Sequence, residues 1–277
     1  MQKNKFLSNK KIKLIFILFL LFIIENCSTT EIKTHYRLNS DTINAPIPNN
    51  TIKITDNNNP KDSIFSFSIS QSHEKNTKVR ILEDNERWTL PNNKIILNYD
   101  FIAENHIALN CGVFYSKANK KDLFGGNVGF GIYNESKNFG FRFDPAIYIQ
   151  EVDFGANITK TTEVWTDGVL ISSSSDTIIE NNIRTRLGYS LTFTVNLKKN
   201  IMGIKPFASF DILWYHYLRT DNGKFRHKST FFAFTPGIYI DLDNNNRLIS
   251  GVRLTKERGN RCSTPYEYFL QYNLKMR

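Results

Sequence analysis

The sequence contains little cysteine, glycine or proline: 3 Cys, 14 Gly and 8 Pro among 277 residues. The three cysteines lack the spacing of a disulfide framework or a metal site, so they indicate neither. The sequence also lacks a Gly-rich phosphate loop, a His/Glu metal pair and a nucleophile elbow. We therefore expect no cofactor, no metal and no catalytic residues, which argues against an enzyme.

A long apolar run is also absent. The run "LIFILFLLFII", Leu14 to Ile24, has eleven residues, whereas a membrane-spanning helix needs about 18 or more. It follows a lysine-rich start, a pattern typical of an export signal. We therefore predict a signal peptide over residues 1–26. Although the formal net charge is +10, nucleic acid is not an expected partner of an exported chain.

Residues 27–62 are polar and have little pattern. Stretches such as "DTINAPIPNN" and "DNNNPKD" are rich in Asn, Asp and Pro, a composition that disfavours a packed core and favours turns. We predict a flexible periplasmic tether over residues 27–62, followed by a folded domain over residues 63–277.

The rest of the chain alternates apolar and polar residues. In "IRTRLGYSLTFTVNL", Ile183 to Leu197, the apolar side chains fall on one face and the arginines on the other, which is the period of a β-strand. We count ten such segments and find no competing helical period. Their cores are residues 65–69, 95–101, 107–115, 128–132, 139–149, 183–197, 204–214, 232–242, 248–254 and 266–274.

The polar faces decide which side of these strands points inward. More than about forty large apolar residues would overfill a barrel of ten strands, and exposed to water they would form too large an apolar patch. An arginine facing the bilayer centre costs about 2–4 kcal/mol. We therefore predict an all-β fold, a transmembrane antiparallel up-and-down β-barrel of about ten strands, with eight as the alternative. Its lumen would hold a charge network of Arg142, Asp144, Arg184, Arg186, Asp211, Asp241, Arg253 and Glu267.

The connections between strands alternate in length, as in outer-membrane barrels with short periplasmic turns and long outer loops. "AEN", "ESKN", "KKNIM" and "DNNN" are short and alternate with mostly longer segments. The longest is Glu151 to Asn182, which contains "VWTDGVLISSSSDT". It could form a partner-binding tip or could extend two strands above the membrane.

Two resemblances add to this reading. "PFASFDILWYHYL", "TPGIYIDLDNNNRLISGVRLT" and "YEYFLQYNL" resemble the strand-turn-strand units of small bacterial outer-membrane β-barrels, a likeness that covers Ile64 to Arg277. This resemblance implies the outer membrane of a Gram-negative bacterium. "IIENCSTT" resembles a lipoprotein cleavage site, which implies acylation of Cys27. Ordinary signal cleavage nearby would instead leave Cys27 as a free thiol.

The strand pattern leaves the activity open between three classes. A structural, adhesion or surface-binding protein would contact outer-membrane lipid, lipopolysaccharide phosphates through basic loop side chains such as Lys121, and an extracellular ligand through its loops. A rim hydrolase could be of two kinds. An omptin-like protease would use His216, Asp221 and His227, whereas a lipid A hydrolase would need a His with an outward-facing Ser nearby, and "HYLRTDN" offers the His but no such Ser. A small channel would conduct past the lumen charges. We expect the first class, because paired acids are not evident near the histidines and a ten-stranded barrel is narrow.

Overall fold

The structure is a computed structural model that describes residues 29–44, 51–56, 59–73, 86–104, 106–118, 120–215, 218–219, 226–227, 230–257 and 266–276. The predicted signal peptide and Cys27 lie outside these residues, as do His216 and Asp221. The described part of the chain contains no helix that is long and apolar enough to cross a membrane. The chain divides into two compact units. We call residues 38–157 and 179–277 the barrel unit, and residues 1–37 and 158–178 the extension.

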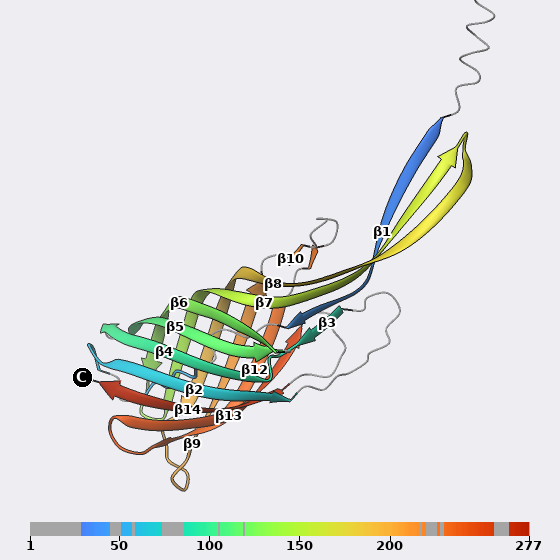
Figure 1. Cartoon of the computed structure of the whole chain (residues 1–277). Helices are drawn as coiled ribbons and strands as arrows, with labels where there is room; N and C mark the ends of the chain where they lie inside the picture. Colours follow the sequence, from blue (N-terminus) through green and yellow to red (C-terminus); the bar gives the residue numbers. More distant parts are fainter. Residues whose placement is uncertain are drawn as a thin grey trace, which may run out of the picture. The chain divides into compact units, whose positions relative to one another are not determined.

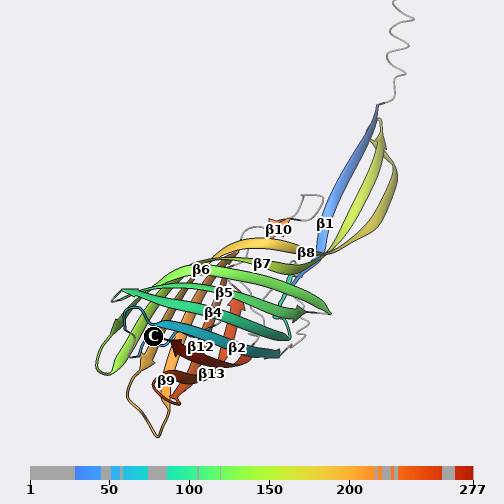
Figure 2. The same ribbon diagram turned by 60° about the vertical axis from the view of Figure 1, so that its left-hand side comes forward.

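Ten strands of the described chain form a closed antiparallel barrel, which confirms the predicted fold (Figures 1 and 2). In chain order they are β2 (Ser63–His73), β4 (Asn93–Glu104), β5 (Ile107–Ala118), β6 (Lys121–Glu135), β7 (Phe139–Thr166), β8 (Val169–Leu197), β9 (Lys205–Tyr215), β12 (Thr230–Asp241), β13 (Asn246–Glu257) and β14 (Tyr266–Met276). The pairing of β7 with β8 closes the ring. The eight-stranded alternative is wrong, because β2 pairs with both β14 and β4.

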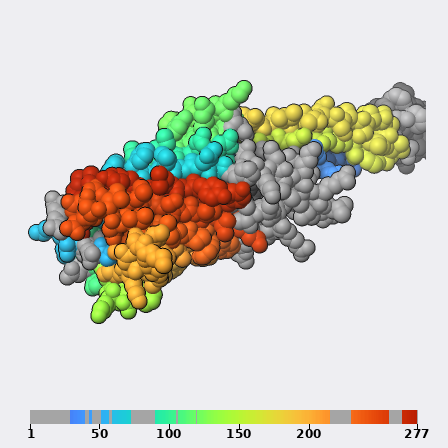
Figure 3. Space-filling model, turned by 90° about the horizontal axis from the view of Figure 1, so that it is seen from below, coloured from blue at the N-terminus to red at the C-terminus, as the bar shows by residue number. Residues whose placement is uncertain are grey.

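The barrel is inverted relative to a soluble one, as the alternation predicts. Outward-facing Phe67, Val128 and Phe234 are 40%, 59% and 46% exposed. Inward-facing Ser68 and Thr194 are fully buried. Strands β12, β13, β14 and β2 lie side by side on the face in Figure 3. Since such an apolar surface is stable in lipid and not in water, this wall crosses a bilayer.

Three prolines fall inside strands, at positions 145, 206 and 236. The register of the flanking pairs is unchanged around each, so none of the three produces a bulge, although each lacks a ladder donor. A register shift does occur between Ile102 and Glu104, at the end of β4. The barrel wall therefore tolerates proline by omitting single ladder bonds.

The segment Glu151 to Asn182 extends two strands. Of the two alternatives that its sequence left open, the structure therefore shows the strand extension. Strands β7 and β8 run on to a two-residue turn at Asp167 and Gly168, with φ of 50° and 78°. Positive φ at both positions is typical of a type I′ turn, and Asp-Gly is a favoured sequence for it. In the extension, β7 pairs with β8 on one side and with β1 (Thr30–Asn44) on the other.

Strand β1 contradicts the prediction of a flexible tether. Its N-terminal part joins the hairpin turn, where Asp167 N donates to Thr29 O at 3.1 Å. Its C-terminal part, in the barrel unit, pairs in parallel with β3 (Glu86–Thr89). A separate two-stranded pair, β10 (Leu218–Arg219) and β11 (Arg226–His227), lies in the β9–β12 connection. The local sequence gives no sign of β1, because its contacts with β7 and the hairpin turn span 118 to 138 residues.

Candidate functional site

Residues 51–56 lie inside the barrel, where the sequence predicts only side chains of the wall. Ile52 and Ile54 are each 2% exposed and pack with the inward-facing Phe207, Tyr239, Ile249 and Phe269. This short stretch alternates apolar and polar residues, "TIKITD", within an otherwise polar region. That alternation is the one sequence signal from which its burial could have been predicted. We call residues 51–56 the lumen segment.

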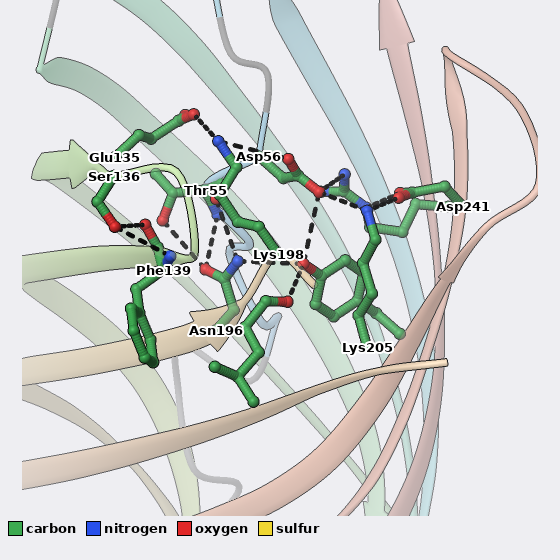
Figure 4. Close-up of polar contacts among 12 residues, drawn as sticks. Thr55, Asp56, Glu135, Ser136, Phe139, Asn196, Lys198, Lys205 and Asp241 are labelled. Atoms are coloured by element: carbon green, nitrogen blue, oxygen red, sulfur yellow. Dashed lines mark hydrogen bonds and ion pairs between the residues drawn. The ribbon is translucent and has the colours of Figure 1, made fainter. Parts of the chain in front are cut away.

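Two amide side chains of the wall hold the backbone of the lumen segment. Gln271 Oε1 accepts from Ile52 N at 2.7 Å, and Gln271 Nε2 donates to Ile52 O at 2.8 Å. Asn196 makes the equivalent pair of bonds with the N–H and carbonyl of Thr55, at 3.2 and 3.1 Å (Figure 4). Buried backbone groups need such partners, and no neighbouring strand supplies them here. The wall therefore carries a specific seat for this segment.

Gly140 of β7 leaves room for the lumen segment. A Cβ at this position would lie 2.3 Å from Thr55 O and 2.6 Å from Asn196 Oδ1. Because Thr55 O is a backbone atom, any side chain here would force the segment or the wall to move. The surfaces of the wall and the lumen segment are thus complementary.

The described residues before and after the lumen segment lie at opposite ends of the barrel. Before it, the end of β1 pairs with β3, and the residues that follow β3 lie at the end with the long connections, where Asn92 N donates to Lys117 O and Asn92 O accepts from Ser72 N. After it, Lys61 N donates to Ile102 O, and Lys275 Nζ contacts Asp62 Oδ2 at 2.6 Å, at the end with the short turns. The chain therefore enters the lumen from the long-connection end and leaves at the short-turn end.

The first charge cluster of the lumen is centred on Arg142. Its Nη1 and Nη2 donate to the two carboxylate oxygens of Asp100 at 2.6 and 2.7 Å. Its Nε donates to both oxygens of Asp144 at 2.9 Å. Lys53 of the lumen segment lies 3.2 Å from Asp144 Oδ1. The two cations and two anions balance, and a Cβ at Gly131 would lie 2.6 Å from Arg142 Nη2, so glycine there makes room for the guanidinium.

The second cluster surrounds Asp56, near the short turns. Lys205 Nζ donates to Asp56 Oδ2 at 2.8 Å and to Asp241 Oδ2 at 2.7 Å (Figure 4). Arg247 Nε donates to Asp241 Oδ1 at 2.6 Å. Lys198 lies 3.6 Å from Asp56 and 2.9 Å from Glu135. The carboxylate of Asp56 thus forms ion pairs with three cations of the wall, Lys198, Lys205 and Arg247.

The predicted network residues separate into several groups rather than one chain of contacts. Arg142 with Asp144, and Arg253 with Glu267 at 3.4 Å, are brought together. Lys94, which the prediction omitted, also binds Glu267, at 3.0 Å. Asp211 accepts from Thr192 Oγ1 at 2.6 Å.

The two remaining arginines lie towards the extension end of β8. Arg184 contacts Glu180 at 3.3 Å, and Arg186 is half-buried on the same face. The prediction also missed Lys53, Asp56 and Asp100, since the first two belong to the supposed tether. Within the described residues, no group of three or more His, Cys, Asp or Glu side chains could hold a metal ion.

Comparisons with known proteins return structural neighbours alone. No family model matches the chain, and no curated protein matches it. A KdgM porin is 9% identical with a TM-score of 0.36, over 77% of this chain and 99% of its own. The translocator domain of the autotransporter NalP from Neisseria meningitidis is 7% identical with a TM-score of 0.35, over 79% of this chain and 90% of its own. An OmpT loop-deletion mutant, an outer-membrane protein of Vibrio cholerae, is 6% identical with a TM-score of 0.26, over 91% of this chain and 100% of its own.

These low similarities add no argument to the one from the strands themselves. The closed ring of ten antiparallel strands, the apolar exterior, the polar interior and the alternation of short and long connections all come from this chain. Together they are the features of bacterial outer-membrane barrels. The chain is a small outer-membrane β-barrel of the kind found in Gram-negative bacteria, with its own N-terminal region inside the lumen.

Proposed function

We propose that this protein is a non-conducting outer-membrane barrel that anchors a surface-binding extension. The observation that carries the proposal is the seating of residues 51–56 in the lumen, with backbone bonds to Gln271 and Asn196 and ion pairs through Lys53 and Asp56. A filled lumen with mutually paired charges favours an anchor over a channel. Barrels that leave an aqueous path have about 16–18 strands.

In this proposal the extension is the part of the protein that binds a partner. Its residues 158–178 connect the barrel parts of β7 and β8, and this connection is one of the long ones, which lie on the outer side in such barrels. The N-terminal part of β1 belongs to the same unit as residues 158–178, so in this proposal it lies on the same side of the membrane. A location on the cell surface therefore replaces the predicted periplasmic tether for residues 29–44.

Two further partners remain predictions within this proposal. The apolar belt would contact membrane lipid. The basic side chains near the outer end would contact lipopolysaccharide phosphates, although Lys121 is already engaged with Asp153 at 2.5 Å and with Asn181 at 2.6 Å. The proposed protein works by binding rather than by catalysis; of the rim hydrolase residues, His216 and Asp221 lie outside the described residues.

Labelling of intact cells tests the orientation on which this proposal depends. In a background without Cys27, Cys111 and Cys262, we expect Ser173→Cys in the extension to react with a membrane-impermeant maleimide. Lys61→Cys, at the short-turn end, is the matched control and should react only after the outer membrane is opened. Labelling of Lys61→Cys but not Ser173→Cys on intact cells would contradict the proposal.

A further inference from the structure

The outer edge of β8 in the extension is an unpaired strand edge. Within the extension, β7 lies between β1 and β8 (Figure 1), and no other described strand pairs with β8 there. In the barrel, β9 takes that side of β8, but its pairing ends at Gly188 opposite Tyr215. A free edge presents a row of backbone donors and acceptors to any strand that can align with it.

The two edges of this three-stranded sheet differ in charge. The β1 edge carries Glu31, Lys33, His35 and Arg37. The β8 edge from Leu170 to Ile178, "LISSSSDTI", carries a single charge, Asp176. Charged side chains, lysine above all, are a usual protection of an edge strand, and proline or a bulge is another. Over this stretch the β8 edge has one charge, Asp176, and neither lysine nor proline.

The sequence of this edge has an approximate two-fold pattern. If Ser174 of one copy faces Ser174 of another in antiparallel pairing, Leu170 lies opposite Ile178, Ile171 opposite Thr177, and Ser173 opposite Ser175. Apolar residues thus meet β-branched residues at both ends, and serines meet serines in the middle. Cross-strand pairs of these kinds stabilise a sheet.

The extension also lacks a core that would make it self-sufficient. Beyond Ile158, none of its described side chains is buried, and Ile171 is 63% exposed. Small sheets gain stability by adding strands or by packing against another element. A second copy provides additional strands, and a two-fold symmetric interface uses the same edge on both chains.

We propose that two copies of this chain associate by antiparallel pairing of their β8 edges, centred on Ser174, into one continuous six-stranded sheet. This inference rests on the proposed surface-binding function and names the partner of the extension: a second copy of the protein. The pairing forms no covalent bond and needs no ligand. Residues 170–178 make the interface, with Asp176 opposite Ser172, so no like charges face each other.

Paired charges at positions 173 and 175 test the register. Ser173→Lys with Ser175→Lys places lysine opposite lysine twice across the two-fold axis, and like charges directly opposite are destabilising. Ser173→Lys with Ser175→Glu is the matched control, because each lysine then faces a glutamate of the other copy. Both variants lose the Ser175 Oγ contact with Thr161 Oγ1 equally.

The measurement is the molar mass of the full chain in detergent by light scattering over a range of concentrations. We expect a dimer for the natural sequence, dissociation constants at least about tenfold higher for the Lys–Lys variant, and restoration by the Lys–Glu variant. A change in gel migration on boiling shows that each barrel is folded. A monomeric natural chain, a dimer unaffected by Lys–Lys, or a Lys–Glu variant that stays monomeric would each overturn the inference.

The two proposals fail separately in these experiments. A monomeric protein whose Ser173→Cys is labelled on intact cells would overturn the self-association alone. An extension that is not labelled on intact cells would overturn the surface-binding function on which the self-association rests.

Discussion

Replacing Arg142 with methionine is expected to lower the free energy of unfolding by about 3–5 kcal/mol, the usual effect of removing one partner of a buried ion pair. The side chain is fully buried and makes four charge-assisted bonds to Asp100 and Asp144. Without it, Asp100 loses the guanidinium that binds both of its carboxylate oxygens, whereas Asp144 keeps Lys53. Denaturant unfolding in detergent, followed by the loss of the heat-modifiable form on a gel, measures the change.

The double variant Arg142→Met with Asp100→Asn is the matched control for this prediction. It removes one cation and one anion and leaves the pair of Lys53 with Asp144 balanced. We expect it to unfold at a higher denaturant concentration than Arg142→Met alone, because no carboxylate is left unpaired. Equal stability of the two variants would show that lost packing, rather than an unpaired charge, dominates.

Deleting residues 29–62 is expected to convert the barrel from a non-conducting to a conducting state. Most wall charges keep a partner of opposite sign, because Asp144 retains Arg142, Lys205 and Arg247 retain Asp241, and Lys198 retains Glu135. The barrel should therefore still fold, with a polar space where the lumen segment was. Water and ions would fill that space, since its lining is polar.

Planar bilayer recordings measure this effect. The full chain should give no regular conductance steps, and the deletion variant should give steps of uniform size. Deletion of residues 29–37 alone, which leaves residues 51–56 in place, is the control and should remain silent. Regular steps from the full chain would favour the small-channel alternative, and silence from a folded 29–62 deletion would mean that wall side chains alone close the lumen.

The barrel wall could be predicted from the sequence because each strand alternates apolar and polar residues. A strand between lipid and a polar lumen must alternate, so Ile183 to Leu197 alone fixes the orientation of β8: Val195 is 44% exposed and Asn196 is fully buried. The two-strand extension was one of two readings of Glu151 to Asn182, and Asp-Gly at its turn decides between them in the structure.

The lumen segment was missed because its partners are distant in sequence and its composition is misleading. Asparagine, aspartate and proline around it are typical of a flexible linker. Its seat is formed by Asn196 and Gln271, which lie 141 and 219 residues from their partners Thr55 and Ile52. The strand pattern predicts that an inward-facing amide belongs to the barrel wall. The residues around it in the sequence do not indicate that it binds the backbone of another segment. The same reason hid Lys53 and Asp56 as partners of the wall charges.

A disulfide between Thr55→Cys and Asn196→Cys is the most direct test that the N-terminal region occupies the lumen. In a background without Cys27, Cys111 and Cys262, mild oxidation of the folded barrel should join the two positions, whose side-chain oxygens lie 3.2 Å apart. Thr55→Cys with Gln150→Cys should not be joined, because Gln150 lies ten residues along β7 from Gly140, about 33 Å away from the Thr55 contact. A boiled, non-reduced gel distinguishes the closed loop from the open chain. The account predicts a cross-link in the first variant alone, and a folded barrel in which both thiols of that variant stay free would contradict it.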